Sequence, residues 1–323
     1  MTKSRKSALD SNSEALLGLG GLARHVATMN VSDFASARER CNWVATTAYD
    51  LGRRVDAAVT SGVPSKIIRD AIRPAVEAWC ASPFVNRLRT WPRGYPGDFE
   101  TIEYLCDGMN MAPPDSMAYH FERFFLSTPI IFQHHFKIEA QARRIATACR
   151  KRDQASVLIL AAGGGRDLLA VADIIKECGT RVVINDIDAD ALALCRSRFS
   201  DFQALQILQG NAFKLTTEFA LAGPFDLIVC GGLFDYVPEP FLRRAIPMMI
   251  KRLLTEDGAL FFTNIAEDSP YRSWLEYFGN WKLIERSEQA IRALIPAEYD
   301  GRVDVGVQRD PTGLAYLVDV RKS

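Results

Sequence analysis

The stretch Val157–Leu169 reads VLILAAGGGRDLL. A short apolar run ends in three glycines, and a helical pattern begins directly after them. Because glycine lacks a Cβ atom, Gly163, Gly164 and Gly165 permit a sharp turn and let a ligand approach the backbone closely. The pattern therefore predicts a buried parallel strand followed by a helix whose first amides face a ligand.

Apolar runs and helical patterns alternate after residue 155. Alternation of this kind predicts a parallel sheet that is covered by helices on both faces. The last two runs flank the turn sequence RDPTG and therefore predict an antiparallel hairpin. We expect strands at 157–161, 181–185, 205–208, 226–230, 259–264, 302–308 and 314–320, and helices near 167–178, 189–199 and 239–254.

The first part of the chain shows only helical periodicity, through residues 13–90 and again at about 115–126 and 129–150. Strand-like alternation is absent there. The sequence thus predicts an all-α N-terminal domain at 1–150 and an α/β domain at 151–323. The apolar stripes of the helices leave room for a homodimer.

The composition limits the kinds of molecule that the protein is expected to bind. The 39 basic residues balance the 39 acidic ones, so no global field would attract nucleic acid. No apolar run is long enough to span a membrane, and the start MTKSRKSALDSNSEALL lacks the apolar core of a signal peptide. Seven cysteines without a CxxC pattern suit reduced thiols. We expect a cytoplasmic protein that acts on a small molecule and, given four histidines without ligand spacing, has no metal site.

The glycine loop lacks the features that bind phosphates. A P-loop needs Lys and Ser or Thr after its last glycine, but Arg166 and Asp167 follow here. A dinucleotide fingerprint needs a third glycine where Leu168 stands, and Asp167 would repel a diphosphate. The loop therefore favours an adenosyl ligand that carries no phosphate.

Three later segments supply the remaining contacts for such a ligand. Asp186 ends the second expected strand, where a carboxylate reaches a ribose diol. Asn211 and Phe213 follow the third expected strand. An amide there can hydrogen-bond to adenine, and an aromatic ring can cover the face of the base. The segment 230–236, CGGLFDY, follows the fourth strand and should border the reactive end of the ligand.

These segments, spread over residues 155–323, resemble a class I methyltransferase dependent on S-adenosylmethionine (SAM). The resemblance implies a Rossmann-like seven-stranded sheet, parallel with a terminal antiparallel hairpin, SAM as the cofactor and methyl transfer (EC 2.1.1.-) as the reaction. Two departures are Ile159, where the family often has an acidic residue, and Ala161, where it has glycine. The implied cofactor residues are Ala162, Gly163, Gly165, Asp186, Ile187, Asn211, Ala212, Phe213, Cys230 and Gly232.

A closer resemblance rests on YPGDFE at Tyr95–Glu100, on GGLFDYVPE and on the ending DPTGLAYLVDV. These motifs are similar to a bacterial subgroup with a helical N-terminal region, described as acting in the synthesis of 3-hydroxy fatty acid methyl ester signals. Asp98 has two interpretations, as a helix N-cap or as part of a lid over the site.

The groups that would face the reacting methyl are acidic and aromatic. We expect catalytic roles for Asp235, Tyr95 and Asp98. Substrate contacts are expected from Glu100, Glu103, Phe234 and Tyr236. Such a pocket favours N-methylation of a cationic amine or guanidine through charge pairing and cation–π contact.

Other functions remain open on the sequence. The subgroup resemblance implies carboxyl O-methylation of a fatty acid or hydroxy fatty acid, with Arg93 or Arg166 as the anchor. A SAM-binding protein without catalysis and an NAD(P) oxidoreductase are more remote alternatives.

Overall fold

The computed structural model describes residues 16–296, 299 and 301–322, so the N-terminal stretch compared above with a signal peptide lies largely outside the described residues. The chain divides into two compact units. One extends to Ile131 and includes Pro270–Lys282, and the other contains Phe132–Ser269 and the chain from Leu283 onward. The division differs from the predicted boundary at residue 150.

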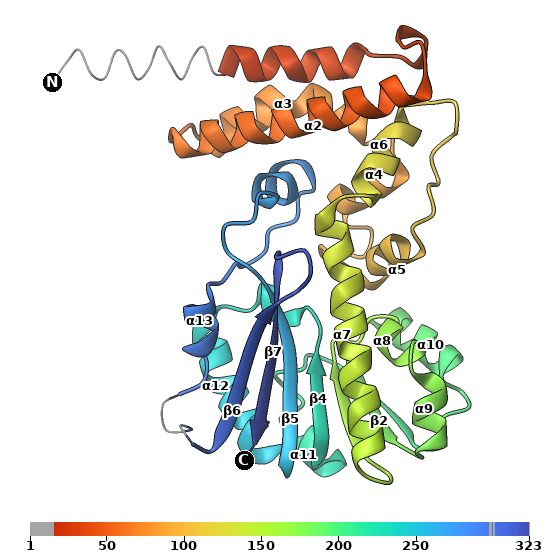
Figure 1. Cartoon of the computed structure of the whole chain (residues 1–323), viewed down its shortest axis with the longest axis vertical. Coiled ribbons are helices and arrows are strands. Elements are labelled where there is room, and N and C mark those ends of the chain that lie inside the picture. The colour runs from red at the N-terminus through yellow and green to blue at the C-terminus, as the bar shows by residue number, and fades with distance from the viewer. Residues whose placement is uncertain (1–15, 297–298, 300, 323) are drawn as a thin grey trace, which may run out of the picture. The chain divides into compact units, whose positions relative to one another are not determined.

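The first unit is helical, as predicted (Figure 1). Trp274, from the later segment, stacks on Trp79 with ring centroids 5.3 Å apart and an angle of 8° between the ring planes. This stacking explains why the segment belongs with the helices, which its sequence did not indicate. The elements are a helix at 16–28, η1 (Val31–Asp33), α2 (Ala37–Thr60), α3 (Ser65–Trp79), α4 (Pro83–Thr90), α5 (Phe99–Asp107), α6 (Met117–Leu126) and η3 (Trp274–Phe278).

The second unit contains a seven-stranded sheet in the order β3-β2-β1-β4-β5-β7-β6. Strands β1 to β5 pair in parallel, and β7 pairs antiparallel with both β5 and β6, so the predicted sheet and its hairpin are confirmed. The strands are β1 (Ser156–Leu160), β2 (Arg181–Asp186), β3 (Leu205–Gln209), β4 (Phe225–Cys230), β5 (Leu254–Ile265), β6 (Val303–Arg309) and β7 (Ala315–Lys322).

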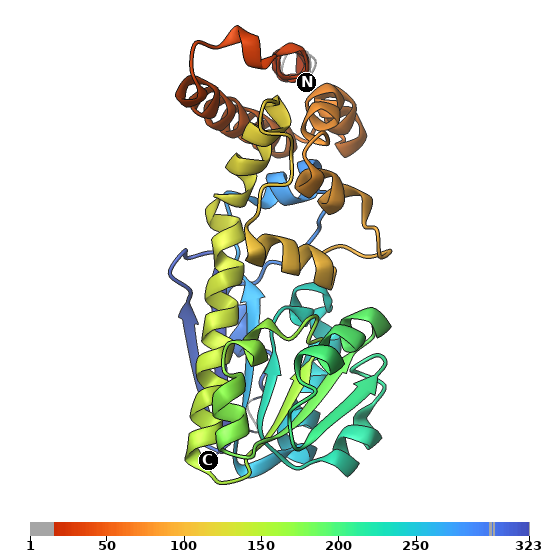
Figure 2. The same ribbon diagram turned by 90° about the vertical axis from the view of Figure 1, so that its right-hand side faces the viewer.

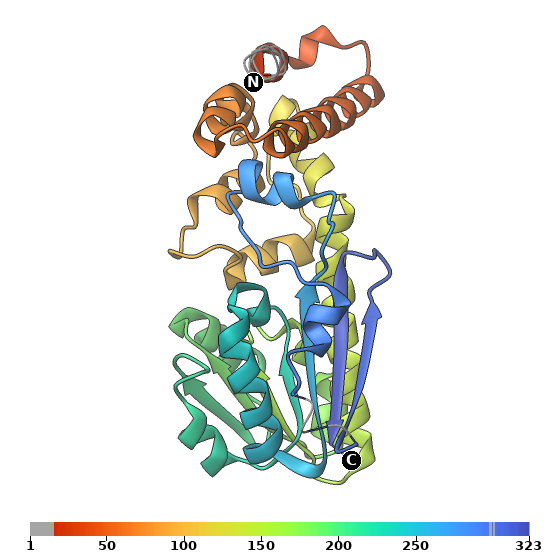
Figure 3. The same ribbon diagram turned by 90° about the vertical axis from the view of Figure 1, so that its left-hand side faces the viewer.

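Helices cover both faces of this sheet, as Figures 2 and 3 show. The expected helix at 167–178 is broken into two short helices, α8 and α9. The helices and short turns of this unit are α7 (Pro129–Lys151), α8 (Arg166–Leu169), α9 (Ala172–Glu177), α10 (Ala189–Arg198), α11 (Thr216–Ala222), η2 (Leu233–Tyr236), α12 (Glu239–Arg252) and α13 (Glu288–Arg292).

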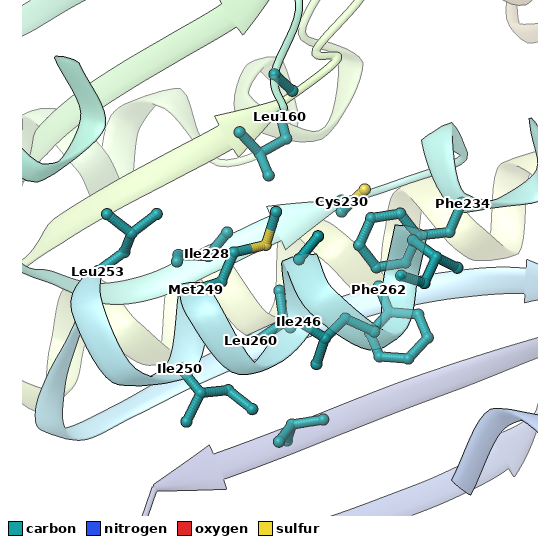
Figure 4. Packing of buried hydrophobic residues seen from close by; sticks show 14 of the residues in the cluster. Leu160, Ile228, Cys230, Phe234, Ile246, Met249, Ile250, Leu253, Leu260 and Phe262 are labelled. Carbon is teal, nitrogen blue, oxygen red and sulfur yellow. The ribbon is translucent and has the colours of Figure 1, made fainter. Parts of the chain in front are cut away.

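Helix α7 packs on the sheet, which is why the chain from Phe132 onward belongs to the same compact unit as the strands. Its apolar residues Ile145 and Cys149 are buried with Ile159 of β1 and Val229 of β4 in one hydrophobic cluster. The opposite face carries a second cluster under α12, in which Met249 and Ile250 pack against strand residues (Figure 4). Two cores thus hold the carboxyl ends of β1 and β4 next to each other.

Candidate SAM-binding site

The glycine loop follows β1 in a left-handed backbone conformation. Gly163 and Gly165 have φ values of +54° and +69°, and Ala161 has a φ of +49°. The Gly165 amide donates to the Ala162 carbonyl at 3.0 Å, which closes the turn before α8. Ala161 therefore occupies a conformation that costs an L-residue about 1–2 kcal/mol and costs glycine nothing comparable.

Asp186 connects the loop to the end of β2. Its Oδ2 accepts the Gly163 amide at 2.8 Å, and its Oδ1 accepts the Asp188 amide at 2.9 Å. Burial raises the pKa of the Asp186 carboxyl from its usual value. The carboxylate predicted to hold a ribose thus also fixes the loop that approaches the ligand.

Helix α10 holds the glycine loop in place through two hydrogen bonds, which the sequence did not predict. The Cys195 thiol donates to the Gly163 carbonyl at 3.3 Å, and Arg198 Nη1 donates to the Gly164 carbonyl at 2.6 Å. A Cβ atom at Gly165 would lie 2.7 Å from Phe199 Cε2. Glycine is required there both for its φ and for the space that this ring takes.

The expected adenine segment follows β3. Asn185 Nδ2 donates to the Leu208 and Gly210 carbonyls at 2.9 and 3.0 Å, which joins the ends of β2 and β3. Asn211 is exposed, and its Oδ1 accepts the Phe213 amide at 2.9 Å. Ile187 is 61% exposed beside Asp186, as an apolar cover for a base would be, whereas Ala212 is buried.

The segment after β4 is held by several buried polar groups. Asp235 Oδ1 accepts the Ile265 amide at 2.6 Å. Buried Arg286 donates to the Phe234 and Val237 carbonyls, and Thr263 donates to the Gly231 carbonyl. This network ties η2 to β5 at the carboxyl edge of the sheet.

Two residues of this segment point into the core. Phe234 is fully buried and packs against Phe262, with 5.1 Å between ring centroids (Figure 4). This burial gives no support to the predicted substrate contact of Phe234, which stays a prediction. Cys230 is also fully buried, which leaves its backbone as the part that can border a ligand, whereas Tyr236 is 37% exposed.

Helix α7 brings two polar side chains to the same edge. Lys137 Nζ lies 3.1 Å from Asp235 Oδ2, and each side chain is 5% exposed. One turn later, the Gln141 carboxamide packs against Gly231, where a Cβ atom would lie 2.5 Å from its Oε1. Neither α7 residue was predicted as part of the site. Lys137, Gln141 and buried Ile145 follow one another at intervals of four residues and therefore share one face of the helix.

The predicted acidic lid residues have partners within the helical unit. Asp98 caps α5 by accepting the Thr101 amide, is 1% exposed and pairs with Arg87 at 2.6 Å. Glu100 pairs with Arg87 at 2.6 Å and with Arg93 at 3.4 Å. The N-cap interpretation of Asp98 is confirmed, and these contacts give no support to a catalytic role for it. The roles of Tyr95 and Glu103 stay predictions.

Asp167 lies in the first turn after the glycine loop and is buried. Its Oδ1 accepts the Leu168 amide at 2.9 Å, and its Oδ2 is enclosed without a hydrogen-bond partner. Burial raises the pKa of this carboxyl to about 6. An enclosed carboxyl beside the loop opposes an anionic ligand by its charge, which fits a cofactor without phosphate.

A family model and solved structures relate the chain to known proteins. Residues 157–258 match a family model described as a methyltransferase domain. Together with the seven-stranded order and the loop without phosphate-binding residues, this match supports SAM as the cofactor.

A search of curated proteins found no match. Among solved structures, the chain is similar to a possible exported protein from Bordetella parapertussis, with a TM-score of 0.58, 16% identity and 96% of each chain covered. It also matches the N-methyltransferase NodS from Bradyrhizobium japonicum, with a TM-score of 0.43, 18% identity, and 58% of this chain and 87% of that chain covered. The first likeness concerns the fold alone, over 96% of this chain.

The described residues add two findings about metals and membranes. In that part of the chain, no group of three or more His, Cys, Asp or Glu side chains is placed to hold a metal ion. No helix within it is long and apolar enough to cross a membrane. The seven cysteines are free thiols.

Proposed function

We propose that the methyltransferase domain methylates a carboxylate oxygen of a small organic acid. The observation that carries this proposal is the buried pair of Lys137 and Asp235 at the carboxyl edge of β4. Among the described residues, Lys137 donates one hydrogen bond, and Asp235 accepts it. An ammonium has three donors, so Lys137 can also orient an anionic acceptor.

The proposed acceptor agrees with the chemistry of the edge. When bound, SAM supplies an activated methyl group on a sulfonium. A carboxylate acceptor is already an anion, so no residue has to remove a proton from it. The task of the protein is then to orient the acceptor, which the Lys137 ammonium and the hydrogen-bonded η2 segment support.

The sequence favoured N-methylation of a cation because it predicted acidic groups that could pair with the substrate. In the structure these acidic groups already have basic partners. Asp235 is neutralised by Lys137, Asp98 by Arg87, and Glu100 by Arg87 and Arg93. A cationic amine would have to compete with these partners. Arg93, one of the two anchors expected for an acid beside Arg166, is itself paired with Glu100, and the proposal rests on Lys137 instead.

The test uses SAM labelled in its methyl group, the full chain and an extract of small metabolites. Mild alkali hydrolyses a methyl ester and releases volatile labelled methanol, whereas an N-methyl group stays on the product. We expect volatile label. Label that remains non-volatile would instead support methylation of nitrogen, and a wild-type chain that binds SAM without transferring label would indicate a non-catalytic SAM-binding protein.

The remaining expectations are proposals as well. We propose a cytoplasmic protein with a small-molecule partner, no nucleic-acid or membrane partner, and room for a homodimer. Free cysteines and an even charge balance support this. Stabilisation by NAD, and not by SAM or S-adenosylhomocysteine, would favour an oxidoreductase instead.

A further inference from the structure

The Gln141 side chain is buried on helix α7. The residue is 7% exposed, and its carboxamide makes no hydrogen bond to the part of the chain that the structure describes. Neither of its polar atoms is among the fully enclosed unpartnered atoms, so both keep contact with open space. A buried amide without partners costs free energy, which a ligand can recover by hydrogen bonding.

The position of Gln141 identifies the open space. Four residues further along α7, Ile145 is buried against the sheet with Ile159 and Val229. One turn closer to the start of α7, Gln141 therefore lies at the carboxyl edge of β1 and β4. A Cβ atom on Gly231, the first residue after β4, would lie 2.5 Å from Gln141 Oε1 and 2.9 Å from Nε2.

This edge is the switch point of the sheet. The order β3-β2-β1-β4-β5 reverses direction between β1 and β4, and ligands bind at such a crevice. Gly232 has nothing within 4 Å of a Cβ position, so the backbone beside Gly231 is open to a ligand.

We propose that the Gln141 carboxamide binds the amino-acid end of SAM. That end carries an ammonium and a carboxylate, and a carboxamide offers an acceptor for the first and donors for the second. The sheet supplies no acidic residue for the ammonium at the end of β1, because Ile159 is an apolar core residue there. Asp186 and Asp235 are already engaged with backbone amides and, for Asp235, with Lys137.

Calorimetry on the full chain tests this inference with two ligands. S-Adenosylhomocysteine contains the amino-acid end, and 5′-methylthioadenosine lacks it but keeps the adenosine and the sulfur. Gln141→Met should weaken binding of S-adenosylhomocysteine about tenfold or more and leave 5′-methylthioadenosine unchanged. Because the carboxamide has no hydrogen-bond partner among the described residues, Gln141→Met should not lower the free energy of unfolding of the apo protein.

Two further variants complete the design. Gln206→Met, at an exposed position of β3, is the matched control and should leave both affinities unchanged. Gln141→Glu should weaken S-adenosylhomocysteine by repelling its carboxylate while strengthening decarboxylated SAM, which keeps only the ammonium.

Two results would overturn the inference. If Gln141→Met lost equal affinity for both ligands, Gln141 would have a merely structural role. If the affinity for both stayed unchanged, Gln141 would not contact the amino-acid end. A wild-type chain that binds neither ligand would overturn the cofactor assignment itself. None of these results depends on the acceptor, so they are distinguishable from failure of the proposed carboxyl methylation.

Discussion

Lys137 Nζ lies 3.1 Å from Asp235 Oδ2, and the two residues are 98 positions apart in the sequence. Both side chains are 5% exposed. Asp235 Oδ1 accepts the Ile265 amide at the same time, so one carboxylate joins α7, η2 and β5. Asp235, for which a catalytic role was predicted, is therefore the anchor that joins these three elements at the carboxyl edge of the sheet.

Breaking this pair should destabilise the protein strongly. Lys137→Met leaves the Asp235 charge buried without its partner, and we expect a loss of about 3 kcal/mol in the free energy of unfolding. The double variant Lys137→Met/Asp235→Asn removes both charges and should recover much of that loss. Urea denaturation of all three proteins measures it, and a loss under about 0.5 kcal/mol in the single variant would contradict a structural role for the pair.

Lys137→Arg keeps the charge and separates positioning of the acceptor from stability. We expect near wild-type stability and unchanged binding of S-adenosylhomocysteine, but a raised KM for the acid acceptor, because a guanidinium places its donors differently. Steady-state kinetics and calorimetry check this prediction. An unchanged KM would argue that Lys137 does not touch the acceptor.

Stability should fall as pH rises through the titration of Asp167. Burial raises the pKa of this carboxyl from 3.8 to about 6, so the folded state holds the proton more tightly than the unfolded state. The stabilising effect of this proton is full below pH 3.8 and is lost as pH rises through 6, by roughly 3 kcal/mol at most. Asp167→Asn should remove that part of the slope in denaturation curves recorded from pH 4 to 8, and an unaltered slope would contradict it.

Relief of strain at Ala161 should stabilise the loop. Ala161 has a φ of +49°, and glycine at this position avoids the steric cost but adds freedom to the unfolded chain. We expect Ala161→Gly to raise the free energy of unfolding by about 0.5–1 kcal/mol. Ala162→Gly is the matched control, because Ala162 is not among the residues with positive φ, and it should destabilise the protein. Equal effects in both variants would argue against strain at Ala161.

A methyl group at Gly165 should disrupt the loop. Gly165→Ala combines a left-handed backbone with a Cβ atom 2.7 Å from Phe199 Cε2, and we expect a loss of about 2–3 kcal/mol together with weaker binding of S-adenosylhomocysteine. Gly179→Ala is the control, since it has a φ of +58° but nothing within 4 Å of the added Cβ. A loss in Gly165→Ala no greater than in the control would show that Phe199 can move aside.

The sequence by itself determined the sheet and the cofactor loop. Apolar runs and the glycines after Leu160 are local signals, because strand burial and a left-handed turn depend on neighbouring residues. All seven expected strands occur, each within a few residues of its predicted bounds except β5, which begins five residues early. The N-cap role of Asp98 is local in the same sense, since its oxygen bonds an amide three residues away.

Only the tertiary structure decided the chemistry of the edge. Helix α7 packs on the sheet through Ile145 and Cys149, and the turns before them reach the carboxyl ends of the strands. Lys137 therefore pairs with Asp235, and Gln141 packs against Gly231. Sequence spacing does not encode such pairings, since they depend on how a helix crosses a sheet. An isolated carboxylate in the sequence suggests a base, and the same carboxylate beside a buried ammonium is neutralised. The local pattern therefore indicated the cofactor, whereas the long-range contacts determine which charges remain for the acceptor.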